Sequence, residues 1–307
     1  MSGRDSQRGM VLFAVLWAIA FCAVLAMATA ATFRGVASVV AIDRDRAQAD
    51  GLLSAGLEAA AGIVAAARNA PLTDRGTEIA LATGSVRIRI SDEGGRIDIG
   101  RAPLEVLVSL LRYVGADDDD ARMLARNIVD LRKSVEPPAA DRAPKQEAVA
   151  KKPDAPATPP LASPFTDTRQ LTNVAGMRAE WMTPMAPLIT VYGSDTVNPL
   201  TAPVAVIRAL PFFDEARLDA FLNVRRAPLA DPERLAFVVG PAQKYLKAQA
   251  TQVVSTQLLA NTTDGYATAA QAFIVLLPDD KQPYRVLAWN PQSPVAAAAT
   301  FMSVGMR

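Results

Sequence analysis

The chain begins with a long apolar run and continues in a helical pattern well beyond it. Residues 10–33 contain no charged side chain. An α-helix rises about 1.5 Å per residue, so this run would reach roughly 36 Å and could cross a hydrocarbon core of about 30 Å. Apolar residues then recur at helical spacing, with charged residues mostly between them: Val36, Val39, Val40, Ile42, Leu52, Leu53, Leu57, Ile63 and Val64. The pattern predicts one helix of up to about sixty residues that ends at Pro71.

A strand pattern follows the helix. Residues 85–90 alternate polar and apolar side chains, and residues 92–95 (Asp-Glu-Gly-Gly) are turn formers. The alternation resumes with Ile97 and Ile99. These segments together predict a β-hairpin with one buried face.

Strand patterns return near the C-terminal end. Residues 251–261, 266–278 and 284–289 alternate or run apolar. Turn signals separate them at Asp264-Gly265 and after Pro278. We expect these segments to be strands of the same sheet as the hairpin.

Helical patterns fill the middle of the chain. Pro103 suits a first helical turn, an apolar stripe follows it, and Gly115 is a typical helix stop. A second helix is expected after Asp117–Asp120, with Met123, Leu124, Ile128 and Leu131 on its apolar face. Helical patterns also cover residues 167–181, part of 197–211 and 214–225. A short strand is expected at residues 188–193.

The order of strands, helices and strands predicts an α+β fold in which a helical domain is inserted into a sheet. The expected domains are the N-terminal helix at 10–70, the sheet at 71–101 and 250–295, and the inserted helical domain at 102–249. Within the insertion, residues 134–164 are rich in Pro, Ala and Lys, and we expect them to be disordered.

Composition excludes several classes of site. The 32 Lys and Arg residues nearly balance the 31 Asp and Glu residues, which gives no basic field for nucleic acid. The chain has no histidine, so a Ser-His-Asp triad and any His-ligated metal site are impossible. The single cysteine, Cys22, lies in the apolar run. We find no nucleophile elbow, phosphate loop or dinucleotide-binding turn. The composition therefore favours a structural or interaction protein over an enzyme.

Two short segments allow a second interpretation. Asp117–Asp120 could bind calcium, but acidic residues at a helix start more often cap the helix and interact with its dipole. Residues 171–177 (Leu-Thr-Asn-Val-Ala-Gly-Met) could suggest a helix-hairpin-helix turn that binds DNA. This segment has a single glycine and no cluster of basic residues, so the sequence favours no nucleic-acid partner.

The N-terminal run allows three interpretations: a secretion signal, a plain membrane anchor, or an anchor that is first cut. Small residues at Ala28, Ala30 and Ala31 could mimic a signal-peptidase site, but the run is longer than the roughly 7–15 apolar residues of a signal. Arg4 and Arg8 place the leader in the cytoplasm by the positive-inside rule. The remainder would then lie in the periplasm of a Gram-negative cell.

A short basic leader, Gly9 before an apolar Met10, and a helix that continues into a soluble head resemble type IV prepilins and type II secretion pseudopilins. The resemblance implies that prepilin peptidase cuts residues 1–9 off after Gly9 and methylates the new amino terminus at Met10. Most relatives carry glutamate at the fifth mature position, where this chain has Ala14. That carboxylate offsets the cost of burying the amine of the subunit above. A subunit with nothing above it needs no such group, so Ala14 suits the tip of a filament.

Further motifs resemble the K-type minor pseudopilins of type II secretion. Leu171, Val174, Gly176 and Met177 match one family segment, residues 197–203 another, and Trp289 the last strand. The resemblance implies a pseudopilin fold with an inserted helical domain of the SAM or helix-hairpin-helix type. It implies a single-pass inner-membrane protein that primes and caps the periplasmic pseudopilus. The implied partners are the I-type and J-type minor pseudopilins, the major pseudopilin and prepilin peptidase.

The sequence departs from the family where calcium is often bound. Residues 131–138, which include Lys133, stand where the family has carboxylates, so we expect neither calcium nor any other cofactor. Two other functions remain open. One is an uncleaved, membrane-anchored adaptor of a secretion complex. The other is a periplasmic hydrolase that uses carboxylates such as Asp92, Glu93 and Asp98, although acidic residues are common near turns.

Overall fold

The computed structural model describes residues 5–67, 72, 76–135, 165–226, 232–277, 280 and 282–304. The expected leader at 1–9 is described only from Asp5 onward. Most of the expected disordered segment at 134–164 lies outside the described residues.

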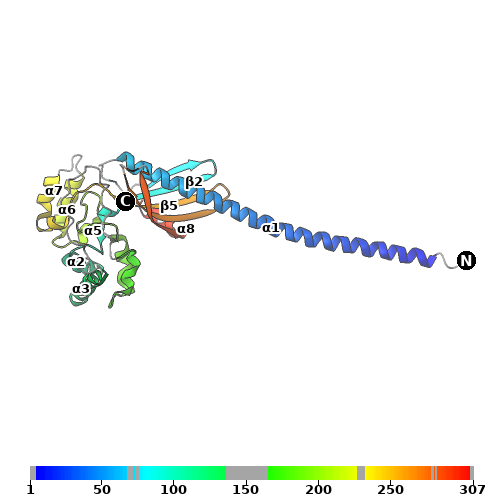
Figure 1. Ribbon diagram of the computed structural model, residues 1–307, viewed down its shortest axis with the longest axis horizontal. Coiled ribbons are helices and arrows are strands. Elements are labelled where there is room, and N and C mark those ends of the chain that lie inside the picture. The colour runs from blue at the N-terminus through cyan, green and yellow to red at the C-terminus, as the bar shows by residue number, and fades with distance from the viewer. Residues whose placement is uncertain are drawn as a thin grey trace, which may run out of the picture.

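A single helix, α1 (Asp5–Ala67), forms the N-terminal part of the protein. It projects far beyond the head, which holds all the other elements (Figure 1). Its 63 residues confirm the prediction of one long helix. The projecting part is the stem, defined here as residues 5–48. The remaining residues of α1 pack on the sheet.

Seven further helices and seven strands form the head in the described residues. The helices are α2 (Leu104–Tyr113), α3 (Asp118–Val135), α4 (Ala179–Met185), α5 (Val204–Ala209), α6 (Glu215–Arg225), α7 (Pro232–Val239) and α8 (Pro294–Val304). The strands are β1 (Gly76–Leu81), β2 (Gly84–Asp92), β3 (Ile97–Asp98), β4 (Ile189–Thr190), β5 (Val253–Thr262), β6 (Ala267–Leu276) and β7 (Tyr284–Gln292). Short 3-10 helices are η1 (Glu93–Gly95), η3 (Thr168–Asn173), η4 (Ala186–Leu188) and η5 (Gly240–Tyr245).

The main sheet has five antiparallel strands in the order β1-β2-β5-β6-β7. The chain leaves the sheet after β2 and returns at β5, which pairs directly with β2. The helices α2 to α7 lie between these two strands in sequence and form a second lobe beside the sheet (Figure 1). The architecture confirms the predicted α+β class.

α1 and α8 cover opposite faces of the sheet. The inward residues of β2, β5 and β6 alternate along each strand and form one core with α1, and its largest members include Leu52, Leu57, Ile88, Leu258 and Ile274. Leu259 and Ala269 face the other way and pack against Ala297 of α8. The alternation of the strands thus supplies an apolar contact to a helix on each side.

Gly56 allows α1 to approach the sheet closely. A Cβ atom at this position would lie 2.8 Å from Val86 Cγ2 and 3.1 Å from Leu258 Cδ2. Any side chain would therefore push the helix away from β2 and β5.

The predicted hairpin at 85–99 is wrong. β2 pairs with β1 before it and with β5, while β3 pairs in parallel with β4 in a separate small sheet. Ile97 and Ile99 are buried in the core of the helical lobe, not in that of the main sheet. The acidic turn formers at 93–95 form η1, which redirects the chain into the helical lobe.

The helix signals of the middle region are confirmed. α2 ends before Gly115, which has φ 101°, and the amides of Gly115 and Ala116 donate back to the carbonyl oxygens of Arg112 and Leu111. The segment at 167–181 is only partly α-helical, because η3 and an irregular turn precede α4. β1, α7 and α8 have no counterpart among the predicted elements.

Candidate functional site

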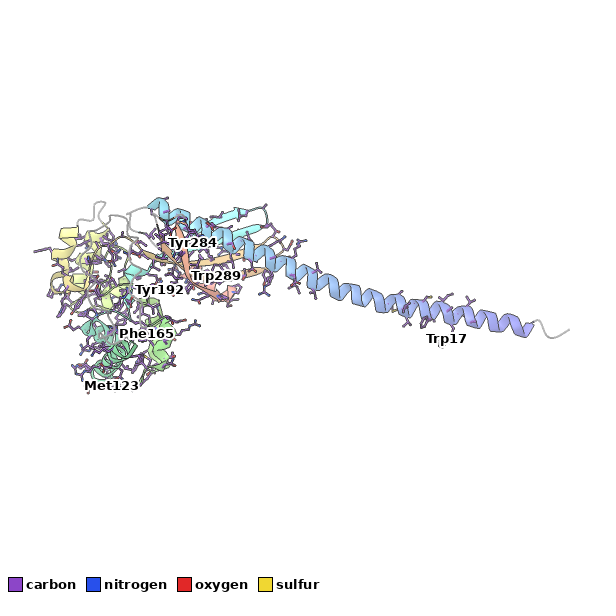
Figure 2. All side chains as sticks on the ribbon, in the orientation of Figure 1. Trp17, Met123, Phe165, Tyr192, Tyr284 and Trp289 are labelled. Carbon is purple, nitrogen blue, oxygen red and sulfur yellow. The ribbon has the colours of Figure 1, made fainter. Side chains whose placement is uncertain are left out.

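Residues 14–27 of the stem expose an apolar surface on every side of the helix. All described side chains from Ala14 to Met27 are exposed, and the large ones are 50–72% accessible: Val15, Leu16, Trp17, Ile19, Phe21, Val24, Leu25 and Met27. Trp17 lies far from the head (Figure 2). A continuous apolar surface of this kind is stable only when lipid or protein covers it.

Among the described residues, one helix is long and apolar enough to cross a membrane, as judged by length and composition. The stretch that meets the length criterion, Val39–Ala67, has a mean hydropathy of 1.3 but is 44% buried. Because its buried residues form the core with the sheet, this stretch is unsuited to contact lipid. The shorter apolar stretch Ala14–Met27 is free of the head and is the better candidate.

Gly9 and Met10 lie within the first turns of α1, ahead of the exposed apolar stretch. Ala14 lies one turn further and is exposed. The helix therefore places the three predicted residues in sequence at the far end of the stem. Cleavage after Gly9, methylation at Met10 and the role of Ala14 stay predictions.

Two acidic residues, Asp92 and Glu93, join the sheet to the helical lobe. Asp92 accepts hydrogen bonds from the amide of Gly94, from Asn198 Nδ2 at 3.3 Å and from Thr201 Oγ1 at 2.6 Å. Asp92 is 5% exposed. Its carboxylate thus ties the end of β2 to the segment before α5.

Glu93 is fully buried and lies next to Asp92. Its Oε2 accepts a hydrogen bond from Thr190 Oγ1, and its Oε1 lies 3.0 Å from Arg96 Nη1. A buried carboxylate is tolerated only when it is paired and hydrogen-bonded, and Glu93 is both. The sequence predicts these acids near a turn, and η1 is such a turn, but it is buried.

Asp98 fixes the loop between β3 and α2. Its two oxygens accept hydrogen bonds from the amides of Gly100 at 2.7 Å and Gly193 at 2.8 Å. Burial raises the pKa of Asp98, although the two amides and the nearby Arg101 and Arg132 act in the opposite direction. Asp92 and Glu93 thus hold the two parts of the head together, and Asp98 fixes a loop within the helical lobe, so all three acids have structural contacts.

Arg132 of α3 anchors the same loop from the other side. Its guanidinium donates to the carbonyl oxygens of Ile99 and Ala102, the latter at 2.8 Å. Burial lowers the pKa of Arg132 to about 10. Its neighbour Lys133 forms an exposed ion pair with Asp130. Arg132 and Lys133, the charged residues that follow Asp130, thus both donate hydrogen bonds.

The acidic run before α3 caps the helix. Asp117 Oδ1 accepts hydrogen bonds from the amides of Asp119 and Asp120, as the capping interpretation predicts. Asp118 pairs with Arg112 at 2.6 Å, and Asp120 pairs with Arg178 at 2.9 Å. Among the residues that the structure describes, no three acidic or cysteine side chains are grouped as a metal site would require.

The motifs at 171–177 and 197–203 serve packing. Leu171 and Val174 are buried in the helical core, and Gly176 has φ 88° with Met123 against it. Asn198 is buried and binds Asp92, and Pro203 caps α5. A capping box between Asp167 and Gln170 begins this region, a signal that the sequence analysis did not use.

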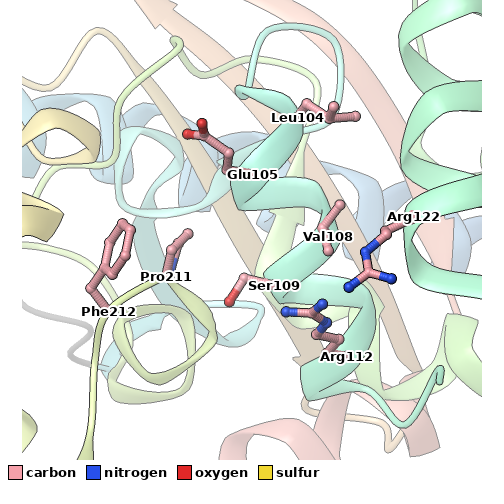
Figure 3. A pocket seen from close by; sticks show the side chains of 8 residues that line it. All are labelled: Leu104, Glu105, Val108, Ser109, Arg112, Arg122, Pro211 and Phe212. Atoms are coloured by element: carbon pink, nitrogen blue, oxygen red, sulfur yellow. The ribbon is translucent and has the colours of Figure 1, made fainter. Parts of the chain in front are cut away.

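An apolar groove of about 400 Å³ opens beside α2. Leu104 and Val108 line one side and Pro211 and Phe212 the other (Figure 3). Phe212 is 54% exposed and has φ 69°, which is strained for an aromatic residue. Across the groove, the Tyr245 hydroxyl donates to Glu105 and lowers the pKa of that carboxyl. No glycine or asparagine marks this strained turn at Phe212, so the sequence pattern does not predict it.

Comparison with known proteins supports the fold alone. No family model matches the chain, and no curated protein matches it. A solved structure does match: the crystal structure of the GspK-GspI-GspJ complex of the type 2 secretion system from enterotoxigenic Escherichia coli. The TM-score is 0.56 at 12% sequence identity, and the alignment covers 82% of this chain and 98% of that chain. The chain therefore has an α+β pseudopilin-type fold, with a long N-terminal helix, an antiparallel sheet and inserted helices, as predicted.

Proposed function

We propose that this protein is a minor pseudopilin of a type II secretion system. The observation that carries the proposal is the match to nearly the whole of one chain in a complex of three such proteins. The exposed apolar stem adds to it, because a pseudopilin needs a stem that lipid covers first and neighbouring helices cover later. The protein would be held in the inner membrane with its head in the periplasm.

Within that class we propose a position at the tip, where the protein primes and caps the pseudopilus. Residues 10–33 contain no charged side chain, so this apolar run offers no carboxylate to the amine of a subunit above it. An unpaired ammonium group among packed helices costs several kcal/mol. The helical lobe also makes the head broad on one side of the sheet, which would obstruct a subunit stacked above (Figure 1).

The partners in this proposal are the I-type and J-type minor pseudopilins, with the major pseudopilin below. Prepilin peptidase would cut after Gly9 and methylate Met10. Mass spectrometry of the protein from a host with active peptidase tests this step, and an intact leader would contradict it. The same measurement separates the proposal from an uncleaved membrane-anchored adaptor.

Co-purification of the full chain with the three other pseudopilins of the same organism tests the tip position. Ala14→Glu should leave the fold and the yield of the complex nearly unchanged, because no amine needs the new carboxylate. Gly9→Leu should block cleavage and reduce assembly. Recovery of this protein at many positions along isolated pseudopili would contradict the proposal.

A further inference from the structure

A second cleft, of about 510 Å³, lies where the helical lobe meets the sheet. Its floor is the face of β6 and β7 that lies opposite α1, with Gln271, Phe273 and Asn290 on it. Its wall is formed by residues 166–169 and 189–192 of the helical lobe. Tyr192 marks the position of this boundary in Figure 2. A cleft of this volume suits a small ligand.

The charges of the cleft neutralise one another. Glu93 pairs with Arg96 at 3.0 Å, and Asp167 pairs with Arg169 at 2.5 Å. Because two carboxylates and two guanidinium groups balance, the cleft offers a phosphate, a carboxylate or a cation no net electrostatic attraction. The cleft therefore favours an uncharged ligand.

The remaining polar groups are carboxamides. Gln292 Nε2 donates to Gln271 Oε1 at 3.1 Å, which leaves the Gln271 amino group and the Gln292 oxygen to bind a ligand. Asn290 lies directly opposite Gln271 on the same face, two residues before Gln292, and is half-buried. Each carboxamide offers a donor and an acceptor in one plane, as two neighbouring hydroxyl groups require.

Two aromatic rings complete the cleft. Tyr192 and Phe273 are half-buried, and their centroids lie 4.8 Å apart with an angle of 39° between the rings. Flat apolar surfaces of this kind pack against the C–H faces of a pyranose ring. A fully apolar ligand is disfavoured, because it would desolvate the carboxamides without bonding to them.

An extended peptide fits less well. Peptides usually add a strand to a free edge, and β7 is the free edge beside this cleft. Pro291 in this part of β7 has no N–H to donate, and the register of β6 with β7 shifts between Phe273 and Ile274. Both features interrupt a ladder of main-chain hydrogen bonds.

We propose that the cleft between β6, β7 and the segment 189–192 binds a neutral oligosaccharide. Tyr192 and Phe273 would pack on a sugar ring, and Gln271, Asn290 and Gln292 would bind its hydroxyl groups. This site is independent of the assembly role proposed above. An assembly defect alone would leave it intact.

The test uses the full chain in a detergent without a sugar head group, such as an amine oxide. The probes are an N-acetylglucosamine tetramer and, as an anionic comparator, a galacturonate tetramer, each titrated by calorimetry. We expect the neutral tetramer to bind at least tenfold more tightly than the anionic one. The double variant Gln271→Ala/Asn290→Ala should weaken that binding at least tenfold.

A control variant sharpens the result. Gln252→Ala removes an exposed carboxamide outside the cleft and should leave binding unchanged. Circular dichroism checks that each variant is folded. Absence of binding by the neutral tetramer, equal binding of both probes, binding unaffected by the double variant, or displacement of the sugar by a neutral hexapeptide would each overturn the proposal.

Discussion

The hydroxyl group of Thr190 donates a hydrogen bond to Glu93 Oε2 at 2.5 Å, although 97 residues separate the two in the sequence. Thr190 belongs to β4 in the helical lobe, and Glu93 belongs to η1 at the end of β2. Both residues are buried, at 2% and 0% exposed. Because water cannot replace this contact, it contributes directly to holding the lobe against the sheet.

Replacement of Thr190 by valine should therefore destabilise the head. Valine has nearly the same shape, but it leaves the buried Glu93 carboxylate without its hydroxyl donor, which costs about 1–3 kcal/mol in the free energy of unfolding. Denaturant titration of the full chain, followed by fluorescence of Trp181 and Trp289, measures the change. Thr263→Val at the exposed turn after β5 is the control, and equal stability of the two variants would contradict the prediction.

Asp98 should give the head a specific dependence on pH. Burial raises its pKa above the ordinary value of about 4, so the folded state binds the proton more tightly than the unfolded state. The stabilisation from this group is fully present below about pH 4 and is lost as the pH rises through the folded pKa. Over that interval, Asp98 makes the free energy of unfolding decrease with increasing pH.

Asp98→Asn removes this titration. The variant should show a flatter decrease of stability with pH than the wild type, measured by denaturant titration between about pH 4 and pH 7. It should also be less stable by about 1–3 kcal/mol, because an asparagine cannot accept from both Gly100 and Gly193. The exposed Asp195→Asn is the matched control. An unchanged slope in Asp98→Asn would refute the assignment.

Gly56 and Gly62 offer a matched test of how closely α1 packs on the sheet. Alanine favours a helix over glycine by about 1 kcal/mol, and a Cβ at Gly62 would meet no heavy atom within 4 Å. Gly62→Ala should therefore stabilise the protein. Gly56→Ala should instead be less stable than Gly62→Ala by about 1–3 kcal/mol, because its Cβ would overlap Val86. Similar melting temperatures for the two variants would show that the helix can shift without cost.

Features set by local sequence were predictable. Three such features are the extent of α1, the glycine that ends α2 and the acidic residue that caps α3. Each depends on residues within a few positions of one another. The strands β5, β6 and β7 also alternate clearly and have turn signals between them. Such signals act within one element, so a single sequence reveals them.

Features set by distant contacts were not predictable. The strand partner of Ile97 is Ile189, and the partners of Asp92 include Asn198 and Thr201. A turn rich in acidic residues normally faces water, and only the approach of these distant segments makes it a buried junction. β1 is short and its residues do not alternate clearly between polar and apolar, so the sequence pattern predicts the hairpin on the wrong side of β2.

Tyr284 links β7 to α1 and should control stability at alkaline pH. Its hydroxyl donates to Glu58 Oε1 at 2.7 Å. Burial, and then the nearby Glu58 carboxylate, raise the pKa of Tyr284 to about 12. Because the folded pKa is raised, this contribution to stability is fully present below about pH 10 and is lost as the pH rises through about 12. Tyr284→Phe removes the hydroxyl, so ultraviolet titration of tyrosinate should lose its step near pH 12, whereas Tyr266→Phe should keep that step. Retention of the step in Tyr284→Phe would show that another of the five tyrosines is responsible and that the contact with α1 does not hold the proton.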